Sequence, residues 1–84
     1  GVTRRLVGFR CTETGAIPRH GYDVYLRDHK VDIVRSGGYS PSLEEPIGTT
    51  YLPTHSTEPG TRIAVDCRGR RVPAEVVKLP FYKE

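Results

Sequence analysis

The chain has 84 residues, with 13 lysines and arginines against 10 aspartates and glutamates and a formal net charge of +3. A chain of this length buries only about 60–65% of the surface that its unfolded form exposes, so its core is thin and leaves little room for a deep substrate pocket. The positive excess permits an anionic partner without indicating one. With no apolar run of ~18–20 residues and no signal-peptide core, we expect a soluble, cytoplasmic protein without a membrane partner.

The first half of the chain alternates apolar and polar residues with the period of two that is typical of β-strands. Residues 5–11 follow this pattern, and so do residues 22–27 and 30–35. The short link at 28–29 predicts that the second and third of these strands form an antiparallel hairpin. The side chains expected in the core are Val7, Phe9, Cys11, Tyr22, Val24 and Leu26.

The second half continues the alternation. Residues 47–52 and 61–68 predict two further strands, with Ile63, Val65 and Cys67 facing inward. A type II′ hairpin at 69–70 then leads to a last strand at 71–79, since glycine supplies the positive φ that such a turn needs. Pro73 lacks a backbone donor, which predicts an edge strand or a bulge near its start.

No segment shows helical periodicity over the 10–12 residues that a helix needs, and the chain has neither an internal repeat nor a linker. Short strands joined by glycine- and proline-containing turns favour an all-β fold. We therefore expect a single domain over residues 1–84. Its predicted architecture is a small antiparallel barrel or jelly-roll-like sandwich of about six strands.

The most unusual stretch is the glycine-rich segment SGGYSPS at 36–42. Two adjacent glycines allow backbone geometry that other residues avoid, and they can bring amides close to an anion. The segment matches neither G-x-G-x-x-G nor G-x-x-x-x-G-K-[ST], so it is not a nucleotide-binding loop. We favour a structural interpretation, a tight β-corner with Tyr39 packed under it.

Residues able to carry chemistry are few and scattered. The separations of His20, His29 and His55 match no zinc pattern, and Cys11 and Cys67 lack C-x-x-C spacing. Both cysteines fall on apolar sides of predicted strands, which favours small reduced hydrophobes over a disulfide. We predict no metal site and no catalytic residue in this chain.

Two basic clusters remain, Arg4-Arg5 and the segment RGRR at 68–71. Basic grooves on small barrels hold phosphates and, with aromatic platforms, single-stranded nucleic acid. Only Tyr25 is predicted to point outward in mid-strand, so a row of stacking aromatics is not evident. A solvated hairpin tip is the favoured interpretation, which disfavours nucleic acid as a partner. The alternative is a free-standing anion- or nucleic-acid-binding barrel.

Several short motifs follow one another in a recognisable order. They are RRLVGF at 4–9, PRHGY at 18–22, SGGYSPSL at 36–43, IGTTYLP at 47–53, PGT at 59–61, RG at 68–69 and KLPFY at 78–82. Each is weak alone, but in this order they cover essentially the whole chain. The chain resembles the C-terminal barrel domain of the glycine cleavage system T-protein family, the aminomethyltransferases.

This resemblance implies a three-domain transferase of glycine catabolism in which the barrel is the last lobe. The family moves a methylene unit from an aminomethyl-lipoyl carrier protein onto tetrahydrofolate and releases ammonia. The cofactor is held mainly by the preceding catalytic domains, which also carry the essential aspartate, so the barrel is not expected to act as an enzyme by itself. Its implied partners are those domains and the lipoylated carrier protein. The one cofactor contact that the resemblance assigns here is Tyr82.

The chain departs from the family pattern in one loop. Where members show Leu-Gly-x-x-Ile-Gly, this sequence has LEEPIG at 43–48, which raises the question whether Glu44 and Glu45 alter the docking of that loop. The domain is also similar to the tails of dimethylglycine and sarcosine dehydrogenases and of folate-dependent demethylases. The ending PFYKE at 80–84 is closer to a bacterial T-protein.

Overall fold

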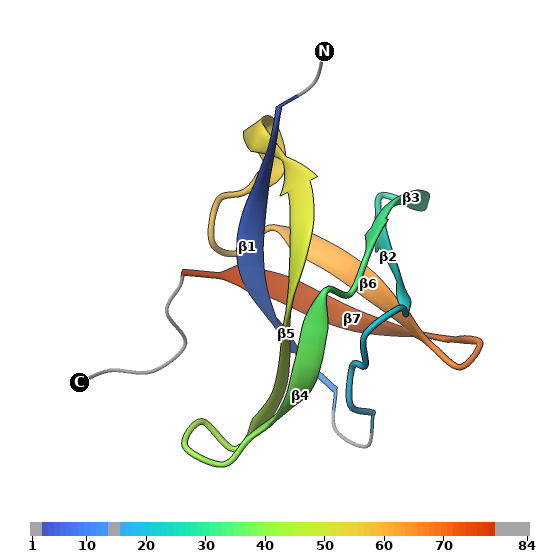
Figure 1. The fold of residues 1–84 in the computed structure, drawn as a ribbon, viewed down its shortest axis with the longest axis vertical. Coiled ribbons are helices and arrows are strands. Elements are labelled where there is room, and N and C mark those ends of the chain that lie inside the picture. The colour runs from blue at the N-terminus through green and yellow to red at the C-terminus, as the bar shows by residue number, and fades with distance from the viewer. Residues whose placement is uncertain (1–2, 14–15, 79–84) are drawn as a thin grey trace.

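A computed structural model describes residues 3–13 and 16–78, which form one antiparallel sheet of seven strands (Figure 1). The strands are β1 (Arg4–Cys11), β2 (Asp23–Leu26), β3 (His29–Ile33), β4 (Ser36–Ser40), β5 (Glu45–Pro53), β6 (Arg62–Cys67) and β7 (Arg70–Val77). A single 3₁₀ turn, η1 (Thr54–Ser56), follows β5. The order across the sheet is β3-β2-β6-β7-β1-β5-β4. The all-β prediction is therefore confirmed, with seven strands in place of about six.

The sheet curls into a half-barrel. In Figure 1, β1, β5 and β4 run upright and cross the pair β6 and β7. The sheet is therefore strongly curved, and its concave face surrounds the core. The core inside it consists of Val7, Phe9, Cys11, Val24, Val34, Leu52, Ile63, Val65, Val72, Ala74 and Val76. Most of the inward positions predicted from alternation lie in this core. Tyr22, Leu26 and Cys67 are half-buried against it.

The predicted β-corner is wrong, because its first five residues form strand β4. This strand pairs with β5 in the register Gly38↔Ile47, and the turn follows only after Ser40. Tyr39 is 51% exposed, so it is not buried under a corner. Glycine has a low intrinsic preference for strands, but the pairing with β5 overrides it. The segment thus supplies the seventh strand.

The prediction for Pro73 is also wrong, because β7 lies between β6 and β1 and pairs with β6 without a register shift. The carbonyl of Pro73 accepts a hydrogen bond from the Thr12 amide at 2.9 Å, so its nitrogen faces the β1 side. The β1–β7 ladder ends at Cys11↔Ala74, one position earlier. The missing N–H therefore faces Thr12, so this position makes one backbone hydrogen bond to the β1 side where another residue could exchange two.

Both predicted hairpins exist, but their turns lie one residue earlier than predicted. The pairs Leu26↔His29 and Cys67↔Arg70 close two-residue loops at 27–28 and 68–69. Arg27 and Asp28 have φ of 52° and 70°, and the second loop has 57° and 88°. Positive φ at both central residues is the signature of a type I′ turn, not of the predicted type II′.

Candidate functional site

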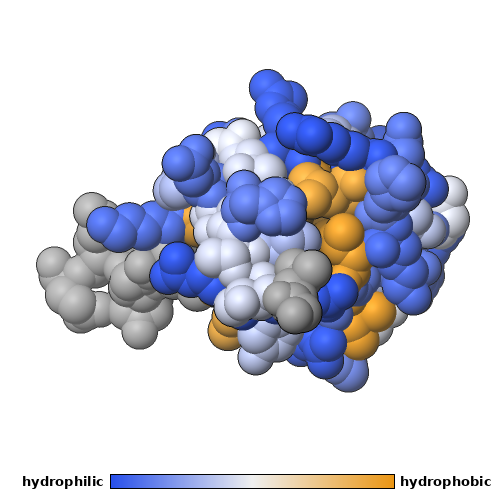
Figure 2. Space-filling view, turned by 90° about the horizontal axis from the view of Figure 1, so that it is seen from above, coloured by the Kyte–Doolittle hydropathy of each residue, from blue (hydrophilic) through white to orange (hydrophobic). Residues whose placement is uncertain are grey.

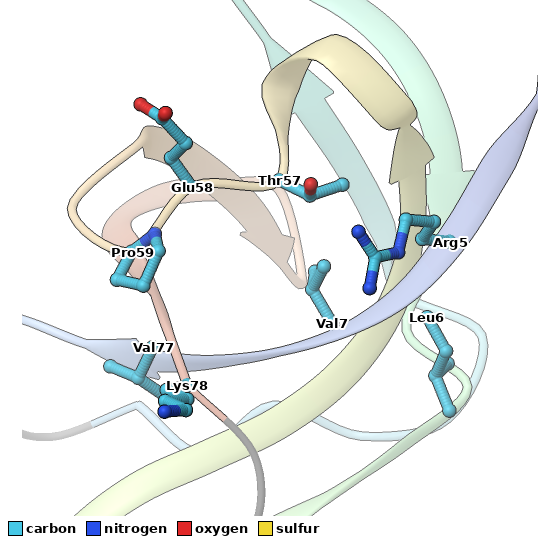
Figure 3. A pocket seen from close by; sticks show the side chains of 8 residues that line it. All are labelled: Arg5, Leu6, Val7, Thr57, Glu58, Pro59, Val77 and Lys78. Atoms are coloured by element: carbon cyan, nitrogen blue, oxygen red, sulfur yellow. The ribbon is translucent and has the colours of Figure 1, made fainter.

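An open groove lies between the start of β1, the loop after η1 and the end of β7 (Figure 3). Its volume is about 580 Å³. The residues that line it are Arg5, Leu6, Val7, Thr57, Glu58, Pro59, Val77 and Lys78. Two backbone hydrogen bonds hold the loop against β7, from the Gly60 amide to the Val76 carbonyl at 2.7 Å and from the Val76 amide to the Thr61 carbonyl at 2.9 Å.

The groove combines an apolar floor with cationic side chains. In Figure 3 the Arg5 guanidinium reaches between Val7 and Thr57, whereas the Glu58 carboxylate points away from the groove. Lys78 contributes a second cation at the end of β7. This combination suits a ligand that has an apolar or aromatic body and an anionic end.

Tyr82, the predicted cofactor contact, lies outside the described residues. It follows Lys78 by four positions in the sequence, and Lys78 lines the groove. The contact of Tyr82 with the cofactor stays a prediction.

A polar centre forms around Asp32, whose side chain is only 5% exposed. It accepts hydrogen bonds from Nε and Nη2 of Arg35 at 3.2 and 2.8 Å and from the backbone amide of Tyr51 at 2.9 Å. The Thr50 hydroxyl lies 3.1 Å from the same carboxylate and 2.9 Å from the Ile33 carbonyl. Asp32 thereby joins β3 to the free edge of β5, where the pairing with β4 has ended.

Two opposing effects act on the pKa of Asp32. Burial on its own raises the pKa of this carboxyl, whereas the hydrogen bonds from Arg35 and from the Tyr51 amide lower it, and the net result is a pKa below the usual range. The carboxylate is therefore ionised at neutral pH. Its partners compensate the negative charge within the domain.

An exposed apolar pair lies just outside this centre. Leu6 on β1 and Tyr51 on β5 are direct cross-strand partners, and they are 45% and 38% exposed. The Arg35 guanidinium lies over the Tyr51 ring at 5.4 Å from its centroid, and Nη1 of Arg4 is 3.9 Å from the Asp32 carboxylate. We call these four side chains, Leu6, Tyr51, Arg4 and Arg35, the Leu6–Tyr51 patch.

The glycines of the motifs SGGYSPSL and IGTTYLP differ in whether their positions require glycine. A Cβ on Gly37 would lie 2.4 Å from the Pro18 carbonyl oxygen, and one on Gly48 would lie 2.5 Å from the Phe9 ring. Both positions therefore need glycine for close packing. A Cβ on Gly38 would meet nothing within 4 Å. Gly37 thus has a structural role in the packing of strand β4, and not in the predicted corner.

The basic hairpin is largely engaged by neighbouring groups. Arg70 is 2.9 Å from the Glu13 carboxylate, and Arg71 is 3.5 Å from that of Asp28. The Arg71 guanidinium also stacks on Tyr25 at 3.7 Å from the ring centroid. One face of the aromatic side chain predicted to point outward is thus covered by a cation, which weakens the nucleic-acid alternative.

The scattered histidines and cysteines do not come together into a site. His20, His29 and His55 are all exposed, and no group of three or more potential metal ligands occurs within residues 3–13 and 16–78. Both cysteines are free thiols. Burial raises the pKa of Cys11 to about 12 and also raises the pKa of Cys67, so neither is a ready nucleophile at neutral pH. Within the same ranges, no helix has the length and apolarity needed to cross a bilayer.

These features define a small antiparallel barrel domain closed by a polar centre and by glycine packing. Residues 4–83 match the family model of the glycine cleavage T-protein C-terminal barrel domain. The chain belongs to this family, and the resemblance seen in its motifs is confirmed.

Relatives and solved structures agree with the family. The chain is 46% identical over 82 residues to an aminomethyltransferase of Bdellovibrio bacteriovorus, a match that covers 96% of this chain and 22% of the relative. It is 46% identical over 83 residues to an aminomethyltransferase of Parasynechococcus marenigrum, covering 99% and 22%. The crystal structure of the glycine cleavage system aminomethyltransferase T from Bartonella henselae superposes with a TM-score of 0.83 at 29% identity, covering 94% and 22%. The chain thus spans about a fifth of the length of the proteins it matches.

Sequence reasoning missed the Asp32 centre and the groove. The signal for Asp32 was its place in the alternation of inward and outward residues. It lies two positions before Val34, which is fully buried, and therefore faces the same side. An acid in phase with a core residue and three positions before an arginine indicates a buried ion pair. The groove had weaker signals, since Arg5 and Lys78 lie far apart in sequence.

Proposed function

We propose that this chain is the C-terminal lobe of a tetrahydrofolate-dependent aminomethyltransferase, in which it completes the folate cleft and braces the catalytic domains. The observation that supports this most is the family match over residues 4–83. The aminomethyltransferase relatives add a second observation: the matches cover nearly all of this chain but only 22% of each relative. On this proposal residues 1–84 form one domain of a longer cytoplasmic enzyme. The catalytic residues then lie in its other domains.

The groove beside Arg5 and Lys78 is the part of this lobe that we assign to the cofactor. Folate carries a flat pterin ring at one end and glutamate carboxylates at the other, and the groove offers apolar walls together with two cations. Charge-assisted hydrogen bonds from Arg5 suit a carboxylate, and an aromatic residue such as Tyr82 suits a ring. The groove is open, so the catalytic domains supply most of the binding energy.

Within the whole enzyme this lobe acts by position. A lobe that closes one side of the cleft excludes water and holds the folate where the methylene unit arrives. The lipoylated carrier protein then delivers the aminomethyl group to the catalytic domains. The contribution of this chain is orientation, since the Glu58 carboxylate points away from the groove (Figure 3).

A chimera tests the proposal. This chain replaces the matching 22% of the Bdellovibrio bacteriovorus aminomethyltransferase, and we expect the fusion to transfer the methylene unit to tetrahydrofolate. The control is the same relative truncated before the replaced part, which we expect to have lost most of its activity. A chimera that folds but has no activity above the truncated control contradicts the proposal.

A second measurement uses this chain alone. We expect titration with tetrahydrofolate to show weak or no binding, because the main cofactor contacts belong to other domains.

In the chimera, Arg5→Ala should raise the KM for tetrahydrofolate more than it lowers kcat, since Arg5 positions the cofactor away from the reacting atoms. Arg62→Ala is the matched control, an exposed strand arginine outside the groove.

A further inference from the structure

We infer that the Leu6–Tyr51 patch is the surface by which this domain docks on the catalytic domains of the same polypeptide. The inference rests on the proposed function and adds to it the contact surface. Two features support it: an apolar pair exposed on the outer face of the sheet, and the guanidinium groups that surround this pair.

The apolar pair lies outside the hydrophobic core of the domain. The outer face of an antiparallel sheet is normally polar, because only the inner face meets the core. Leu6 and Tyr51 nevertheless lie opposite each other on that face, across the β1–β5 ladder. Figure 2 looks down on the end of the molecule from which β1 starts, and it shows that apolar residues are exposed between hydrophilic side chains on this side. Exposed apolar surface with a polar rim is typical of an interaction site.

The rim of the patch carries surplus positive charge. Arg4 and Arg35 both approach the single carboxylate of Asp32, at 3.9 and 2.8 Å. One negative charge cannot balance two guanidinium groups, so the rim favours a partner surface with carboxylates. Arg35 is also held in place by its bidentate contact and by the Tyr51 ring, which lowers the entropy lost on docking.

The position of the patch favours the catalytic domains as the occupant. In this family the barrel is the C-terminal domain, so the preceding polypeptide enters at β1, and Leu6 lies two residues after the start of that strand. A tethered partner is present at high effective concentration, so a small patch suffices. A second copy of this chain is disfavoured, because two such patches would bring their arginines together.

Cysteine footprinting on the chimera described above tests this inference directly. Leu6→Cys should react with a maleimide at least tenfold more slowly in the chimera than in this chain alone, because docking covers the position. Leu43→Cys is the control, since Leu43 is 37% exposed and lies in the turn at the other end of β5. It should react equally in both. Cys11 is buried and Cys67 is half-buried, and both add little background because their raised pKa values disfavour the thiolate.

Equal reaction rates for Leu6→Cys in the chimera and in the chain alone overturn the inference. If that chimera is active, the proposed function still stands, so the two failures are distinguishable. Leu6→Asp gives a second readout: it should leave the melting temperature of this chain unchanged within about 4 °C, as exposed substitutions do. Because Leu6 also lines the groove, activity of the chimera is measured at saturating tetrahydrofolate, where we expect it to fall severalfold. A dimer of this chain that Leu6→Asp dissolves would assign the patch to a second copy and would also overturn the inference.

Discussion

The two halves of β5 satisfy the same edge of the same strand in different ways. Along residues 45–49 the edge pairs with β4, and the close packing there depends on glycines that have no side chain. At Thr50 and Tyr51 the ladder has ended, and the carboxylate of Asp32 takes the place of a strand. One half therefore requires the absence of side chains, whereas the other depends on a single side chain. The two halves should respond differently to substitution.

The largest effect is expected for Asp32→Ala. This change leaves the Tyr51 amide without its acceptor and removes the ion pair with Arg35. We expect a loss of about 2–4 kcal/mol in the free energy of unfolding, because a buried donor left unsatisfied costs its desolvation. Urea denaturation measures it. Asp23→Ala is the control, since its partially exposed ion pair with Lys30 should contribute under about 1 kcal/mol. Equal losses for the two variants would show that Asp32 does not close the sheet.

The glycine half should respond next, and only at certain positions. Gly48→Ala and Gly37→Ala each place a methyl group against atoms that include backbone, so we expect losses of about 1–3 kcal/mol. Gly38→Ala has open space and should change the free energy of unfolding by less than about 0.5 kcal/mol. Thermal melting of the three variants under one condition makes the comparison. A loss for Gly38→Ala as large as that for Gly37→Ala would contradict the packing explanation.

The sequence predicted what depends on alternation, and failed where the partner strand decides. Alternation placed Phe9 and Val65 in the core, because a buried face repeats every second residue. It did not reveal that Asp32 turns inward, because burial of an acid depends on donors that come from β5. Pro73 was misjudged for a similar reason, since alternation does not show that β7 lies between β6 and β1. The assignment of Tyr82 stays a prediction.

A pH titration sharpens the polar half of the comparison. The folded state lowers the pKa of Asp32, so this group stabilises the fold above its unfolded pKa of about 3.9. That stabilisation is lost as the pH falls through the lower folded-state pKa. We therefore expect the difference in unfolding free energy between the parent chain and Asp32→Asn to shrink below about pH 4. A difference that stays constant down to pH 2 would assign the stabilisation to packing instead of charge.

The smallest effect is expected at the turn that leads into the glycine half of β5. Glu44 has a φ of 57°, a left-handed conformation, at the position where the family pattern has glycine. Glu44→Gly should therefore raise the free energy of unfolding by about 0.5–1 kcal/mol, because relief of the strain exceeds the entropy that glycine adds to the unfolded chain. The neighbouring Glu45→Gly is the matched control and should destabilise, since Glu45 lies in a strand and pairs with Arg10. Urea denaturation measures the change in unfolding free energy for both variants. Changes of opposite sign would explain the departure from the family pattern as local strain in the turn. A loss for both variants would show that Glu44 makes a contact that glycine cannot replace.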